Sequence, residues 1–278
     1  MTSATLTLSA RPRLQAWSAT ALASATTFWF VATVIGQCIF AVYILALYGG
    51  SAVRGNFKGW NHVMTHGHVP GDTAGNLVTG AHLLLAMLIM LGGALQLVPQ
   101  VRRRAPVFHR WNGRVYLTGA VVAALSGLYM VWLRGAVGDM AQHLGTSLNA
   151  VLVLLFAGLA LWRALQRDFA AHNRWALRLF LAVSGVWFFR VGLMFWIAIH
   201  GGPSGFNPDT FTGPFLSFLS YAQYLLPLAV LQLYLLCRAH GGTTARFGMT
   251  ALLVLCSVAM SIGIFVATIG MWLPSIKW

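Results

Sequence analysis

The 278-residue sequence contains no glutamate and only four acidic residues, Asp72, Asp139, Asp168 and Asp209. Enzymes that use a pair of carboxylates for acid and base catalysis are therefore nearly excluded by composition. Charged residues make up only 8% of the chain, whereas 58% is apolar and the mean hydropathy is +0.74. A soluble protein of this size needs more polar surface than that. The composition predicts an all-α membrane protein that crosses the bilayer several times.

Cysteine is also scarce, and Cys38, Cys237 and Cys256 all lie in or beside apolar runs. No C-x-x-C-H motif is present, so covalent attachment of a c-type haem is not indicated, and the cysteines are interpreted as small buried residues. The net charge is +14, but the basic residues border apolar runs, which is typical of membrane anchoring. We therefore expect membrane lipid as a partner and no nucleic acid.

Seven apolar segments are long enough to cross a bilayer as helices. They are expected at residues 28–48, 78–98, 109–134, 143–162, 172–199, 214–237 and 248–273. The first is interpreted as a retained helix because its apolar run is too long for a signal-peptide core. On this basis we divide the chain into helix one with an outer loop (1–78), a core of helices two to five (79–200) and helices six and seven (201–278).

Lysine and arginine are distributed unequally between the two sides of the membrane. With seven spans, the side of the N-terminus carries thirteen of them: Arg11, Arg13, Arg102, Arg103, Arg104, Arg110, Arg114, Arg163, Arg167, Arg174, Arg178, Arg238 and Arg246. The other side carries four: Arg54, Lys58, Arg134 and Lys277. Because basic loops stay in the cytoplasm, we predict a bacterial inner-membrane protein with a cytoplasmic N-terminus and a periplasmic C-terminus.

Four histidines, His82, His109, His143 and His172, lie at the starts of helices two to five. Since successive helices run in opposite directions, His82 and His143 fall near the outer face, and His109 and His172 near the inner face. An imidazole in hydrocarbon needs a partner or a metal, and two facing imidazoles suit the axial positions of haem iron. The pattern predicts that helices two to five form a four-helix bundle with two b-type haems. Taken alone, each histidine is as compatible with a hydrogen-bonded structural residue.

Arginines near these histidines are candidate partners for the haem propionates. Arg190 lies eighteen residues after His172, so in a continuous helix it would share the face of His172 about five turns away, beside the outer haem. Candidates at the inner haem are Arg110, Arg114, Arg174 and Arg178, although orientation and lipid contact explain them equally well. Asp168 either accepts the ring N–H of His172 or pairs with a nearby arginine.

Two further sites are weaker candidates. Three histidines of the outer loop have a spacing that could hold Cu²⁺ or Zn²⁺, or could help attract a small anionic reductant: His62, His66 and His68. Four polar residues of helix six could line a quinone pocket or simply anchor the helix at the interface: Tyr221, Gln223, Tyr224 and Gln232.

Several motifs resemble known families. They are H-x(10)-G-x-x-Q-L-x-P from His82 to Pro99, then RRRAPVFHRWNGRVYL, and then HNRWALR with the downstream Arg190. These segments resemble the bacterial membrane-protein family catalogued as domain of unknown function 2306, which implies a multi-pass membrane protein without a settled activity. The order of the four histidines is similar to that of the cytochrome b561 group, two-haem proteins that pass electrons across membranes. That resemblance implies His82 with His143, and His109 with His172, as axial ligands.

The hypothesis that follows is a transmembrane dihaem cytochrome. Its exchange partner could be a quinone, an ascorbate-like reductant, superoxide or a metal ion, which would make it a transmembrane oxidoreductase, and a homodimer is left open. One alternative is an intramembrane metal-dependent hydrolase, although that activity needs ligands at one depth and a carboxylate base. Another is a transporter without haem, in which the histidines relay protons.

Overall fold

The computed structural model describes residues 4–276, and this part of the chain is helical apart from short loops and one isolated bridge between Asn207 and Thr212. The helices are α1 (Ala4–Ile44), α2 (Gly50–Val53), α3 (Thr73–Leu97), α4 (Pro99–Arg104), α5 (Pro106–Trp132), α6 (Met140–Leu165), α7 (Phe169–Val183), α8 (Gly185–His200), α9 (Pro214–His240), α10 (Thr243–Ala267) and α11 (Leu273–Ser275). Three short segments of other helix types lie between them. Two are π-helical, η1 (Leu45–Gly49) and η3 (Thr268–Trp272), and one is a 3-10 helix, η2 (Phe57–His62).

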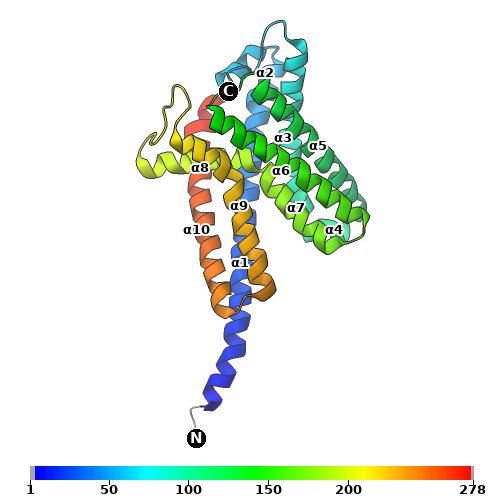
Figure 1. Ribbon diagram of the computed structural model, residues 1–278, viewed down its shortest axis with the longest axis vertical. Coiled ribbons are helices and arrows are strands. Elements are labelled where there is room, and N and C mark those ends of the chain that lie inside the picture. The colour runs from blue at the N-terminus through cyan, green and yellow to red at the C-terminus, as the bar shows by residue number, and fades with distance from the viewer. Residues whose placement is uncertain (1–3, 277–278) are drawn as a thin grey trace.

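Among residues 4–276, six helical segments are long and apolar enough to cross a membrane, and α7 with α8 makes a seventh if the pair is one bent span. The prediction of an all-α, multi-pass membrane protein is confirmed. The two ends of the chain lie at opposite ends of the molecule (Figure 1). We name the end that carries residues 54–72 the loop end, and the end that carries Arg102–Arg104 the arginine end.

The helices form two groups that lean apart. The first contains α3, α5, α6 and α7, which pack in chain order because short connections make successive helices antiparallel neighbours. In the second, α1 and α10 lie along each other although they come from opposite ends of the chain, and α9 stands beside them (Figure 1). The groups diverge toward the arginine end (Figure 1).

The predicted fifth helix, residues 172–199, is not one straight helix, and that prediction is wrong. The span is interrupted at Ser184, where α7 and α8 meet at an angle of 52°. Polar side chains from two other helices occupy the break: Gln37 Nε2 donates to Ser184 Oγ (3.0 Å), and Asn149 Nδ2 donates to the Ala182 carbonyl (3.1 Å). A bend inside a membrane is stable when such side chains satisfy the main-chain groups that it frees.

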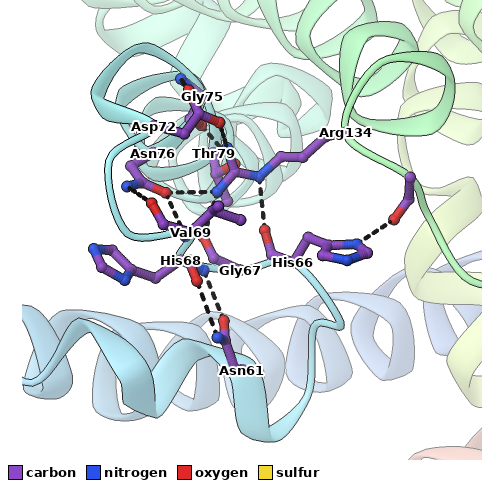
Figure 2. Close-up of polar contacts among 11 residues, drawn as sticks. Asn61, His66, Gly67, His68, Val69, Asp72, Gly75, Asn76, Thr79 and Arg134 are labelled. Carbon is purple, nitrogen blue, oxygen red and sulfur yellow. Dashed lines mark hydrogen bonds and ion pairs between the residues drawn. The ribbon is translucent and has the colours of Figure 1, made fainter.

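One arginine organises the loop end. The guanidinium of Arg134, just after α5, is only 4% exposed and holds Asp72 Oδ2 at 2.7 Å. It also donates to the His66 carbonyl (2.6 Å), to Asn76 Oδ1 (2.6 Å) and to the Gly67 carbonyl (3.3 Å), as Figure 2 shows. The outer loop is thereby tied to both α3 and α5. From the sequence, Arg134 enters only the count of basic residues that predicts the orientation in the membrane.

Candidate functional site

A cavity of about 280 Å³ lies between the first helix group and the helices α1 and α8, toward the loop end. Small residues make up much of its wall: Ala86, Ala120, Ala123, Ala124, Gly127 and Ala150. The bent span borders the cavity on both sides of its break, through Ala182, Val183, Val186 and Arg190. Three methionines, Met64, Met90 and Met130, also line it, and such flexible side chains let a cavity adapt to the shape of a ligand.

His82 presents an acceptor nitrogen at this cavity. Its Nδ1 lies 2.8 Å from Ser126 Oγ, and that oxygen lies 2.7 Å from the Val122 carbonyl oxygen. The carbonyl can only accept, and the hydroxyl has a single hydrogen, so Nδ1 of His82 is the donor to Ser126. The lone pair of the neutral ring is then on Nε2. His82 is therefore in the tautomer that a metal ligand requires, with its orientation fixed by an outer hydrogen bond.

Arg190 borders the same cavity as His82. Its Nη1 donates to the Val186 carbonyl (3.0 Å), and its guanidinium carbon lies 5.3 Å from the centre of the Phe40 ring. Within residues 4–276, the ion pairs are Arg134 with Asp72 and Arg163 with Asp168, so Arg190 has no acidic partner there. The structure brings Arg190 and His82 to one cavity, as expected, but by way of a bent span rather than the straight helix from which this was inferred.

His143 does not reach this cavity. Its Nε2 lies 3.2 Å from the Ala136 carbonyl, and its ring packs edge-on against Trp132 with the ring centres 5.9 Å apart. Thr146, one turn further along α6, does line the cavity. His143 thus lies one turn outside the site, on the same stripe of α6, because residues three apart share a helix face.

The second histidine pair lies at the arginine end. His172 Nδ1 donates to the Ala160 carbonyl (2.8 Å), which leaves the lone pair on Nε2, as in His82. His109 has a buried Nδ1 without a hydrogen-bond partner. Asp168 caps α7 by accepting from the Ala171 N–H (3.0 Å) and lies 3.7 Å from Arg163. Of the two roles considered for Asp168, the structure has the ion pair rather than the bond to His172.

None of the arginines expected at the inner haem lines the cavity beside His82. Arg110 and Arg174 are exposed, and Arg114 lies over the Trp111 ring at 4.8 Å. Arg178 donates to Gln232 Oε1 (2.8 Å), which ties α7 to α9. Gln232 is one of the residues considered for a quinone pocket, and the other three do not line the cavity beside His82: Tyr221, Gln223 and Tyr224.

The three histidines of the outer loop do not converge. In the part of the chain that the structure describes, no group of three or more His, Cys, Asp or Glu side chains gathers as a metal site. His66 bonds to the Gly135 carbonyl (2.8 Å), and His68 stacks on Phe57 with the ring centres 5.7 Å apart, while His62 is exposed at the end of η2. The His66 and His68 rings are held by different partners, so the three histidines are not gathered in this structure, and the Cu or Zn site stays a prediction.

Sequence reasoning missed the polar side chains that surround the break. Asn149 and Gln37 are buried, and their oxygens Oδ1 and Oε1 have no hydrogen-bond partner. The indole N–H of Trp187, three residues after Ser184, is also buried and unpartnered. Asn149 borders the cavity, so the space between His82 and Arg190 is more polar than the run of alanines suggested. A buried Asn or Gln in an apolar span was the available signal.

Comparison with known proteins adds a family but no activity. No curated protein and no solved structure matches the chain. The matching family model covers residues 79–212, the stretch that contains all four core histidines and Arg190. That model is of the family described as predicted membrane protein (DUF2306), to which this part of the chain is similar.

Proposed function

We propose that the protein is a membrane-embedded, b-type haem electron carrier. The observation that carries the proposal is the cavity shared by His82, with a free Nε2 lone pair, and Arg190, a cation without an acidic partner among residues 4–276. An imidazole lone pair suits an axial position on iron, and a guanidinium suits a propionate. Bound haem would supply a one-electron couple. His82 would orient the ring, Arg190 would neutralise its carboxylate, and the alanine walls would exclude water.

The remaining three histidines complete two ligand pairs in this proposal. His172 has the same tautomer as His82, and the unpartnered Nδ1 of His109 leaves that ring without a competing bond on that nitrogen. His143 would have to give up its 3.2 Å contact with the Ala136 carbonyl to serve as the second ligand opposite His82. The contact is partly exposed and easily replaced by water, so the change costs little. Exchange partners would be a quinol or a small anionic reductant.

A second candidate is transport of a small polar solute or of protons, and the broken span favours it. Transporters often place their binding sites where a membrane helix is discontinuous. Here Gln37, Asn149 and Trp187 leave three buried polar atoms unpartnered around such a break. A polar substrate or water would complete their hydrogen bonds. In that case the histidines would relay protons rather than hold iron.

We also propose an orientation in a bacterial inner membrane. With seven spans, thirteen arginines of the sequence fall on the side of Arg102–Arg104 and four basic residues fall on the other side, and Arg190 within the fifth span completes the eighteen. The positive-inside rule then puts the arginine end in the cytoplasm. Alkaline phosphatase joined to the C-terminus should be active, and green fluorescent protein in the same place should be dark. The reverse result would invert the assignment.

Haem stoichiometry of the purified protein tests the main proposal. We expect two b-type haems per chain by pyridine haemochrome assay, and one in each of His82→Ala, His143→Ala, His109→Ala and His172→Ala. His240→Ala is the matched control, because this exposed histidine ends α9 away from the core. A well-folded, colourless preparation would favour the transporter. Loss of a single haem from the His240→Ala variant would refute the ligand assignment.

A further inference from the structure

A second cavity of about 420 Å³ lies where the two helix groups diverge, between α1, α7, α8, α9 and α10. Its wall is almost entirely apolar and aromatic and includes Trp29, Leu177, Phe188, Leu226, Leu253 and Met260. Phe180 and Leu181 border it, whereas the neighbouring Ala182 and Val183 border the first cavity. The bent span therefore separates two spaces of different character.

Polar groups line this second cavity mainly toward the arginine end. Asn173, in the first turns of α7, and Arg238, in the last turn of α9, both border it, together with Tyr234. The Arg238 guanidinium carbon lies 5.8 Å from the Tyr234 ring centre. In the described part of the chain the two ion pairs involve Arg134 and Arg163, so the charge of Arg238 is not neutralised by an acid there. A space with apolar walls and a cation at one end fits an amphiphile with a negative head.

We propose that this cavity binds one anionic phospholipid, with an acyl chain between the helix groups and its phosphate at Arg238 and Asn173. Charge decides the class of occupant. By the sequence, thirteen basic residues flank the spans on this side of the membrane. Asp168, five residues before Asn173, is committed to capping α7 and to Arg163. The phosphate of a phospholipid accepts both from the guanidinium and from the Asn173 amide. In a zwitterionic head an ammonium beside the phosphate cancels its charge, whereas an anionic phospholipid brings the net negative charge that balances Arg238.

The acyl chain would also have a structural effect. The two helix groups lean apart toward the arginine end (Figure 1), and a void there would forfeit the contacts of the apolar side chains that line it. A chain from the bilayer fills the space without any change in the helices. The lipid would then join α7 to α9 and α10 at the cytoplasmic side.

Native mass spectrometry of the full chain, released from micelles, tests the inference independently of any haem. Phosphatidylglycerol and phosphatidylcholine with identical acyl chains are compared as probes. We expect one retained phosphatidylglycerol per chain and about fivefold weaker retention of phosphatidylcholine, the factor that one basic residue contributes to anionic-lipid binding. Arg238→Gln should abolish the preference, while Arg246→Gln, a basic residue of the same side that does not border the cavity, should keep it.

A second variant tests binding of the lipid acyl chain separately from binding of the phosphate. Ala259 borders the cavity, so Ala259→Phe should fill the space and lower the retention of both lipids, while the protein remains monodisperse with an unchanged melting temperature. Equal retention of the two lipids by the unmodified chain would overturn the proposal. So would displacement of phosphatidylglycerol by a neutral lipoquinone with the same dependence on Arg238, which would assign the cavity to a quinone instead.

Discussion

Replacing Arg134 by lysine tests whether the loop end is held by the shape of the guanidinium or only by its charge. Lysine can keep the ion pair with Asp72 but cannot reach the carbonyl of His66 and the amide of Asn76 at the same time. Both lost bonds are short, at 2.6 Å, and come from a charged donor. The bond to the Gly67 carbonyl is long, at 3.3 Å, and contributes little.

The free energy that Arg134→Lys costs the closed loop follows from these contacts. A hydrogen bond to a charged group contributes about 1.5–3 kcal/mol, so two such bonds give an upper value of roughly 3–6 kcal/mol on that scale. Asp72 is 37% exposed, and water can replace part of what is lost. We therefore expect a net loss of about 2 kcal/mol for local opening of the loop, which corresponds to about 30-fold faster opening.

Amide hydrogen exchange of residues 64–72, followed by mass spectrometry, measures this opening. The loop amides of Gly67, His68 and Val69 are hydrogen-bonded in the closed state and are the reporters. Arg54→Lys is the matched control, since Arg54 is exposed in the same loop. If exchange in Arg134→Lys equals exchange in Arg54→Lys, the guanidinium network is not what holds the loop, and the reasoning fails.

Three further predictions concern single positions. Gly75→Ala should destabilise the loop end about as much as Arg134→Lys, measured by the same exchange, because its Cβ would collide with the Arg134–Asp72 pair. The pKa of Asp139 lies below its ordinary value chiefly because the Gln142 N–H donates to the carboxylate. The ionised Asp139 carboxylate therefore stabilises the fold fully above about pH 4, and this stabilisation is lost as the pH falls through the lower pKa. Asp139→Asn should flatten the dependence of the melting temperature on acid pH. Asn149→Leu removes the donor to the Ala182 carbonyl and should lower the melting temperature, whereas Leu148→Ala at the exposed neighbouring position should change it little.

The helix starts of the core could have been placed more accurately from the sequence. They were expected at residues 78, 143 and 172, but the helices begin at Thr73, Met140 and Phe169. In each case the preceding residue is an aspartate whose side chain accepts a main-chain N–H: Asp72, Asp139 and Asp168. An aspartate before an apolar run is a known N-terminal signal. The apolar runs start later than the helices because hydropathy marks where the membrane begins rather than where the helix does.

The break in the bent span was only partly predictable. Ser184 and Gly185 form the kind of pair at which helices kink, and that signal stood in the sequence. Which way the span bends depends on Gln37 and Asn149, residues of other helices that bond to Ser184 and Ala182. No pattern local to residues 172–199 contains that information. His143, at a predictable helix position, is likewise held by neighbours outside its own helix, the Trp132 ring of α5 and the Ala136 carbonyl.

The shortage of acidic residues links the fold to the proposed ligand. Three of the four aspartates are used as helix caps, and two of these also pair with Arg134 and Arg163. Asp209, the fourth, lies in the exposed loop between α8 and α9, in a turn with Asn207. None of the four aspartates is thus left to pair with Arg190 at the cavity that it shares with His82. A cation at membrane depth is costly unless an anion accompanies it, and this cost supports the proposal that the group bound beside His82 carries both a carboxylate and a metal.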